Sequence, residues 1–173
     1  MGVDASPGWI LTTAYALHML ATVVWIGGIA FQTVLLLPAA LPFSSAQTMF
    51  ELYQKLWRRF QPLAWLSLAV LTGTGLMQMA ANRNYAGFLS IENRWSIAIL
   101  LKHIAIAFMV ALMAFQTWVL YPRWARLELI LARSSGQTDA GEASLLQREN
   151  WLIRIQLALS ALVLILTAIA RTA

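Results

Sequence analysis

The sequence predicts an all-α fold: a bundle of four helices that each cross a membrane, with both chain ends on the outer side. Of the 173 residues, 60% are apolar and only 11% are charged. A soluble domain carries about a quarter charged residues, because its surface faces water. Four separate stretches of roughly 20 mostly apolar residues are each long enough to cross ~30 Å of hydrocarbon at about 1.5 Å per residue.

Prolines bound the first two spans. The first covers residues 9–37, because Pro38 and Pro42 lack the backbone N–H that would continue a helix. A short amphipathic stretch, residues 46–59, follows it. Pro62 then opens the second span, residues 61–81, since proline is well tolerated in the first turn of a helix.

The other two spans flank the longest polar segment. The third covers residues 95–121 and the fourth covers residues 151–170. Residues 123–150 between them are predicted to form a loop. Residues 1–173 are therefore expected to form a single four-span domain.

The basic residues indicate how the spans are oriented. Seven lie at the ends that carry the first and third loops, namely Lys55, Arg58, Arg59, Arg123, Arg126, Arg133 and Arg148. Three lie at the opposite ends, namely Arg83, Arg94 and Arg171. Because cytoplasmic loops carry the excess of Lys and Arg, we expect a multi-pass protein of the inner (plasma) membrane with both termini outside the cytoplasm.

Composition excludes several classes of function. The chain has no cysteine, so disulfides, thiolate metal sites and iron–sulfur clusters are excluded. Its net charge of +5 lies mostly at the ends of the spans, where basic residues contact anionic lipid. We therefore expect the lipid bilayer, and not a nucleic acid, to be the partner of these charges.

Two histidines, His18 and His103, lie inside spans that enter the membrane from the same side. Each is eight or nine residues from the outer end of its span, which is roughly 12–14 Å deep. Imidazoles at one depth on facing helices are typical of a b-type haem with two axial histidines. Thr72, Gly73 and Gly75 lie near that depth and are predicted to form a wall without bulky side chains. The alternative is that these residues only bond and pack neighbouring helices together.

Lys102 is a further ionisable group inside a span. It precedes His103 and therefore points about 100° away from it around the helix. No acidic residue lies within the four predicted spans. Lys102 is therefore expected to pair with a haem propionate or another anion, or else to extend its ammonium to the outer interface.

Methionines in the spans suggest a different ligand. Thioethers are soft donors that suit Cu(I). Met109 and Met113 are four residues apart and share a helical face, and Met19 is adjacent to His18. A copper site is therefore an alternative to haem, and simple packing of the methionines is an alternative to both.

Residues 15–28, Tyr-Ala-Leu-His-Met-Leu-Ala-Thr-Val-Val-Trp-Ile-Gly-Gly, resemble the first helix of the copper resistance protein D (CopD) family, as does Leu-Leu-Leu-Pro at 35–38. The pairs Thr72-Gly73, Leu101-Lys102 and Pro122-Arg123 fit the same pattern, so the resemblance covers roughly residues 15–126. It implies a four-helix inner-membrane unit linked to copper uptake or to a bound haem. His18 and Lys102 also give a more distant likeness to HemJ-type membrane proteins.

From these observations we expect a membrane protein that binds haem b between the first and third spans and transfers electrons, with a redox partner at its outer face. It would then be a membrane oxidoreductase or an electron-transfer subunit of one. Copper transport is the first alternative, and a non-catalytic subunit of a membrane complex is the second. Either a homo-oligomer or a hetero-oligomer is compatible with the sequence.

Overall fold

The computed structural model describes residues 8–36, 38, 46–83, 85, 87, 89, 91–123, 126 and 140–172. Its elements are α1 (Gly8–Ala30), the π-helix η1 (Phe31–Leu36), α3 (Ala46–Ala80), α4 (Arg94–Phe115), the π-helix η3 (Gln116–Leu120) and α6 (Ala140–Thr172). Each π-helix continues the α-helix before it. The described part of the chain contains no strand.

Four helical stretches are long and apolar enough to cross a membrane: Gly8–Leu36, Gln54–Ala80, Arg94–Arg123 and Gln147–Thr172. The four stretches coincide with the four predicted spans to within a few residues at most ends. For the described residues, the predictions of an all-α fold and of four helices long and apolar enough to span a membrane are therefore confirmed.

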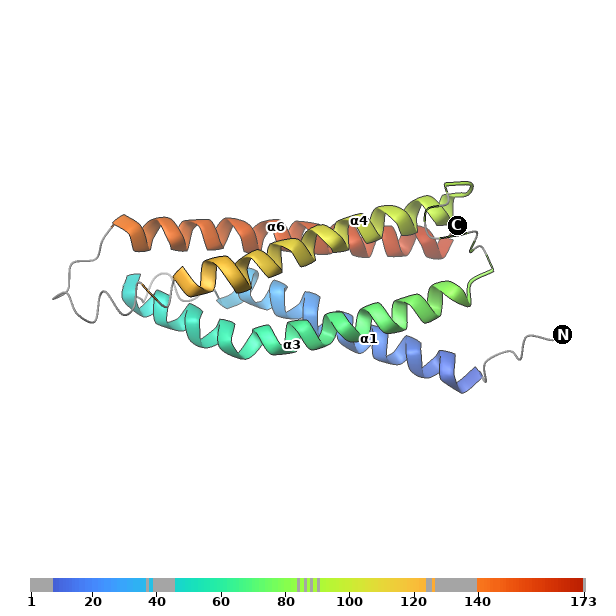
Figure 1. Ribbon diagram of the computed structural model, residues 1–173, viewed down its shortest axis with the longest axis horizontal. Helices are drawn as coiled ribbons and strands as arrows, with labels where there is room; N and C mark the ends of the chain where they lie inside the picture. Colours follow the sequence, from blue (N-terminus) through green and yellow to red (C-terminus); the bar gives the residue numbers. More distant parts are fainter. Residues whose placement is uncertain are drawn as a thin grey trace.

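The second helix begins earlier than predicted. Residues 46–59 were expected as a separate amphipathic stretch, but they form the first part of α3, and Pro62 lies inside this helix. A proline inside a helix removes one backbone hydrogen bond and crowds the preceding turn, which bends the helix without having to end it. The ribbon of α3 accordingly curves along its length (Figure 1).

The fourth helix also begins earlier than predicted. Part of the expected loop, residues 140–150, is the start of α6, and it is rich in Ala, Leu, Glu and Gln, which favour helix. Glu149 therefore lies in a helix and inside an apolar span, contrary to the expectation that no span contains an acid. Arg133 and residues 134–136 of the predicted loop lie outside the described residues.

The start of α4 shows how local chemistry sets a helix boundary. Asn93 has an extended backbone, with φ −138° and ψ 164°, and its side-chain oxygen accepts a hydrogen bond of 2.7 Å from the Ser96 backbone N–H. This cap satisfies one of the backbone donors that the first turn of a helix leaves without a partner. The third helix therefore begins at Arg94, one residue before the predicted start of the third span.

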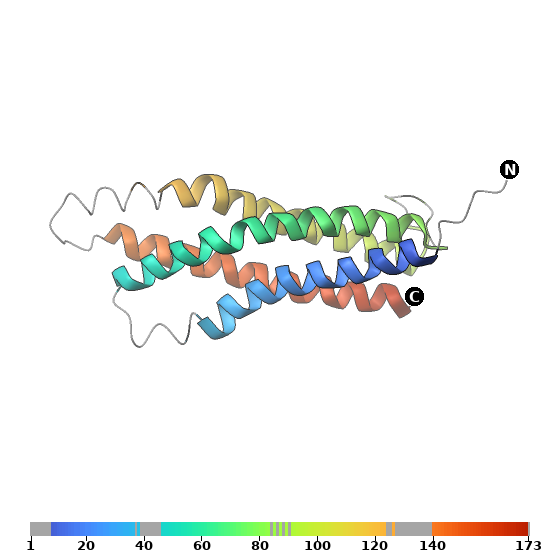
Figure 2. The same cartoon turned by 90° about the horizontal axis from the view of Figure 1, so that it is seen from below.

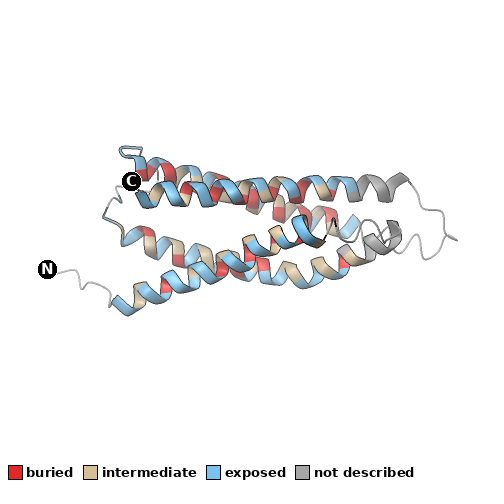
Figure 3. Ribbon diagram, turned by 180° about the vertical axis from the view of Figure 1, so that it is seen from behind, coloured by how far each residue is buried: buried red, intermediate tan, exposed pale blue. Residues whose placement is uncertain are grey.

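The helices are arranged as two closely packed pairs. α1 packs mainly against α3, and α4 packs mainly against α6. Figures 1 and 2 show the long helices running alongside one another, with the start of α1 and the end of α6 at the same end of the molecule. In Figure 3 the buried positions lie where the helices meet, and the exposed positions lie on their outward sides.

All four helices contribute to one buried cluster. It consists of Trp25, Ile29, Ala64, Ala105, Met109, Met113 and Val163. Because lipid tails are as apolar as these side chains, the helices associate through close packing rather than through exclusion of water. Small residues such as Ala64 and Ala105 allow that close approach.

Gly28 on α1 packs closely against Phe60 on α3. A Cβ atom at this position would overlap the ring of Phe60, whereas a Cβ at the neighbouring Gly27 would have no atom within 4 Å. Gly28→Ala is therefore expected to lower the free energy of unfolding in detergent by about 1–3 kcal/mol, the usual effect of overfilling a packed site.

Gly27→Ala is the matched control for this substitution. Alanine favours helix over glycine by about 1 kcal/mol, so this variant should be as stable as the wild type or slightly more stable. Equal melting temperatures for the two alanine variants would show that α1 does not approach α3 closely at Gly28.

Candidate functional site

His18 is held by a hydrogen bond between α1 and α3. Its Nδ1 lies 2.9 Å from the hydroxyl oxygen of Thr74, and that hydroxyl lies 2.6 Å from the carbonyl oxygen of Val70. A hydroxyl has one proton, and the Val70 carbonyl can only accept it, so Thr74 must in turn accept a hydrogen bond from His18 Nδ1–H. The remaining lone pair of the His18 ring is therefore on Nε2.

The predicted wall of small residues divides into two parts. Gly75 lies against His18, since a Cβ at Gly75 would be 3.4 Å from Cε1 of the imidazole. Thr72 and Gly73 are exposed, and the Thr72 hydroxyl donates to the carbonyl of Leu68 in its own helix. The structure thus brings Gly75 to the imidazole but places Thr72 and Gly73 on the outward side of α3.

His103 and Lys102 are both half-buried on α4. His103 Nδ1 lies 2.7 Å from the carbonyl oxygen of Ile99 and therefore donates to it, which places the ring's lone pair on Nε2. The ammonium of Lys102 is within electrostatic range of His18 and of Arg171. Lys102 thus lies near both His18 of α1 and Arg171 at the end of α6.

The three candidate methionines do not share one environment. Met109 and Met113 are 1% and 4% exposed and belong to the buried cluster of all four helices. Met19 is 63% exposed, on the face of α1 that points away from the other helices. The structure therefore separates Met19 from the two methionines of α4.

The metal hypotheses rest on imidazoles and thioethers rather than on a cluster of acids. Within residues 8–172 as far as they are described, no group of three or more His, Cys, Asp or Glu side chains converges. That His18 and His103 face each other across one shared site stays a prediction.

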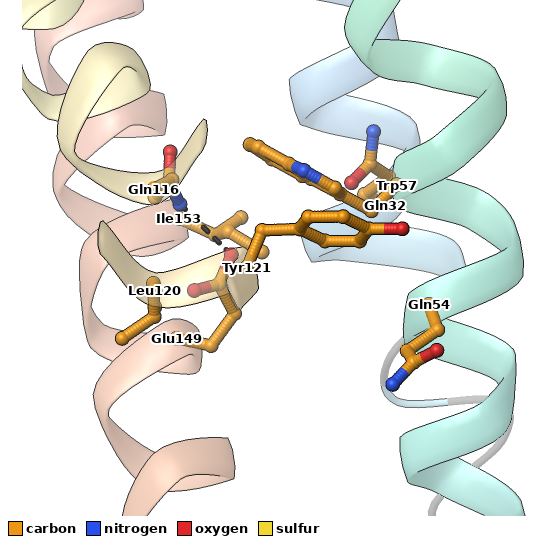
Figure 4. A pocket seen from close by; sticks show the side chains of 8 residues that line it. All are labelled: Gln32, Gln54, Trp57, Gln116, Leu120, Tyr121, Glu149 and Ile153. Carbon is orange, nitrogen blue, oxygen red and sulfur yellow. Dashed lines mark hydrogen bonds between the residues drawn. The ribbon is translucent and has the colours of Figure 1, made fainter. Parts of the chain in front are cut away.

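A second polar region lies near the opposite end of the helices. It is a pocket between the two helix pairs, lined by Gln32, Gln54, Trp57, Gln116, Leu120, Tyr121, Glu149 and Ile153. Figure 4 shows the residues of η3 and α6, together with Tyr121, on one side of the pocket and those of η1 and α3 on the other. The two π-helices thus border the same pocket, and π-helical segments are frequent at functional sites.

Buried amides form a ladder beside this pocket. Gln116 Nε2 donates to a Glu149 carboxyl oxygen at 2.9 Å, and Gln156 Nε2 donates to Gln116 Oε1 at 2.8 Å. All three side chains are buried. Figure 4 shows the Gln116–Glu149 bond as a dashed line. The ladder joins η3 to α6 through neutral amides and one carboxyl group.

This pocket is not among the sites that the sequence predicts. Gln32, Gln116 and Gln156 are visible in the sequence as polar residues inside apolar spans, which is costly in a membrane unless each finds a partner. Glu149 was not predicted to lie in the membrane, because the fourth span was predicted to begin at Trp151. The feature of the sequence that could have indicated the pocket is therefore these three glutamines, each of which lies on the buried side of its own helix.

Comparison with known proteins identifies the family. Residues 54–170, about two thirds of the chain, match the family copper resistance protein D. The matched region contains Lys102, His103, Met109 and Met113, while His18 lies before it. No curated protein and no solved structure matches the chain, and nothing in these comparisons supports the likeness to HemJ-type proteins. With four apolar helices long enough to cross a membrane and this match over most of its length, the chain belongs to the copper resistance protein D family.

Proposed function

We propose that this protein carries copper ions across the membrane, with Cu(I) as the transported ion. The proposal is supported by the family, whose name refers to copper resistance, and by four helices able to span a bilayer. Copper transport is the first of the two alternatives to haem binding that the sequence left open.

The observation that carries the proposal is the buried methionine pair of α4. Met109 and Met113 lie one helical turn apart, and both side chains are buried where all four helices meet. Two thioethers in an apolar interior are soft ligands that suit Cu(I) better than hard divalent cations. The pair therefore offers a transient ligand site in the middle of the membrane.

The histidines supply a second ligand type nearer the proposed entry. Metal-binding histidines almost always donate their other ring N–H to a carbonyl, a carboxylate or a water, which fixes the lone pair on the ligating nitrogen. His103 donates to a carbonyl, and His18 donates to a hydroxyl, so both have their lone pair on Nε2. Along α4, His103 is about 9 Å from Met109, and Met113 is about 6 Å further.

The distribution of basic residues predicts which ligands face the outside of the cell. The positive-inside rule places the Arg58 end of the helices in the cytoplasm and both termini outside, in the inner membrane. Copper would then meet His18 and His103 before the methionine pair. This order corresponds to uptake from the outside.

Haem b remains the competing candidate. It depends on His18 and His103 as axial ligands, on Lys102 as the partner of a propionate, and on the small-residue wall. Thr72 and Gly73 are exposed, so the wall is reduced to Gly75, where the His18 imidazole already occupies the adjacent space. The comparisons point to copper and not to haem.

Reconstitution of the full chain in liposomes tests the proposal. With ascorbate to keep copper reduced, a copper-sensitive dye inside the liposomes should report Cu(I) entry at a rate well above that of protein-free liposomes. The purified protein should have no haem absorption. A Soret band without copper entry would favour the electron-transfer hypothesis. Neither signal would favour a scaffolding subunit of a membrane complex.

A further inference from the structure

The carboxyl group of Glu149 is the least expected group in the apolar part of the protein. It is 5% exposed on α6, inside a stretch apolar enough to span a membrane. Among the described side chains its partner is the neutral amide of Gln116. A carboxylate buried without a cation is strongly disfavoured, so the group must either hold a proton or bind another cation.

The basic groups on neighbouring turns of the helices either contact other side chains or are exposed. The Arg148 guanidinium lies 5.2 Å from the ring centroid of Phe115, and Arg58 Nε donates to the Tyr121 hydroxyl at 2.7 Å. Lys55 and Arg154 are exposed on the outer sides of α3 and α6. Neither π-helix, η1 or η3, contains a titratable residue, and Tyr121 directly follows η3.

The amide ladder fixes which atoms face the carboxyl group. Gln116 Oε1 accepts from Gln156 Nε2, and so the Gln116 amide turns its N–H toward Glu149. A neutral carboxylic acid can accept this bond through one oxygen and still donate its own proton elsewhere. The amides therefore do not require an ionised carboxylate.

The pocket beside Glu149 has the size and polarity to hold water. Its cavity volume is about 20 Å³, enough for one water molecule. On the α3 side, Gln54 Nε2 and Trp57 Nε1 are buried donors with no hydrogen-bond partner, and Gln54 is only 8% exposed. Two such donors on one wall and a carboxyl group on the other make the cavity polar, which favours its occupation by a water.

We propose that Glu149 is a proton-binding site, neutral at neutral pH, whose proton exchanges with water through the pocket between the two helix pairs. In this exchange the O–H bond of the carboxylic acid breaks, the proton passes to a water in the pocket, and a proton from water restores the acid. The site stands apart from the copper ligands and does not depend on copper transport.

Infrared spectroscopy of the full chain in lipid nanodiscs tests the site. At neutral pH the wild type should show the C=O stretch of a protonated carboxylic acid, and Glu149→Gln should lack it. The exposed Glu92 is the matched control, because Glu92→Gln should leave the band unchanged. In D₂O the band should shift promptly, because water in the pocket would exchange the proton of the acid.

A further measurement covers the case in which Glu149→Gln does not fold. Glutamate labelled with ¹³C at the carboxyl group should move the same band in the wild-type protein. Trp57→Phe, which removes one donor from the pocket, should slow the shift in D₂O severalfold. A wild-type spectrum with no protonated-acid band, or a band that is unchanged by the label, would overturn the proposal. These results are independent of whether copper enters liposomes.

Discussion

Replacing Gln116 by leucine is expected to lower the free energy of unfolding by about 3 kcal/mol. The Gln116 amide donates to Glu149 and accepts from Gln156, so leucine would leave two buried polar groups without their partner. Each buried group that loses its partner typically costs ~1–3 kcal/mol. Thermal or denaturant unfolding of the purified protein in detergent measures the loss.

Two comparisons make this result specific to the ladder. Gln78→Leu removes a longer bond of 3.3 Å to the Ala14 carbonyl at a half-buried position and should cost clearly less. The double variant Gln116→Leu/Glu149→Leu removes both members of a bonded pair, and it should be less destabilised than the sum of its single substitutions. If Gln116→Leu cost no more than Gln78→Leu, the ladder would not be important for stability.

Replacing both Met109 and Met113 by leucine is expected to reduce copper entry into liposomes at least about ten-fold. Loss of a residue that only orients a metal ligand commonly costs ~10–100-fold in affinity, so loss of the ligands themselves should cost no less. Leucine conserves most of the methionine volume, and each substitution should change stability by less than about 1.5 kcal/mol. The protein should therefore fold normally while losing transport.

The exposed methionines supply the matched control. Met19 and Met77 are 63% and 46% exposed, and Met19→Leu with Met77→Leu should leave copper entry unchanged. Full transport by the Met109→Leu/Met113→Leu protein would mean that these side chains only pack. Equal losses in both double variants would point to a general effect of removing thioethers rather than to a path along α4.

The spans were predictable because apolar length is a property of the sequence alone. The helix boundaries were less predictable. Pro62 favours a helix start by its chemistry, but a proline is also accommodated inside a bent helix, and only packing decides between the two. Residues 140–150 are polar enough for a loop and yet are rich in good helix formers, so that α6 begins seven residues before the apolar stretch Gln147–Thr172.

The candidate site was predictable in its residue types but not in its contacts. Histidines inside apolar spans indicate function from sequence alone. Which of the residues from Thr72 to Gly75 would face His18 depends on the rotation of α3 about its axis, and Thr74 and Gly75 are the pair that does. The pocket at the other end joins residues from all four spans. No local spacing could show that the two π-helices border it.

The pairing of the helices separates two groups of buried side-chain hydrogen bonds among the described residues. His18–Thr74 lies within the α1–α3 pair, and the ladder from Glu149 through Gln116 to Gln156 lies within the α4–α6 pair. Across the seam between the pairs lie the Arg58–Tyr121 bond and the stacked rings of Trp65 and Trp118, whose centroids are 5.8 Å apart. If the pairs tilted as rigid bodies against each other, these seam contacts would change first, and so would the width of the pocket. The bonds that orient His18 and Glu149 would be preserved throughout.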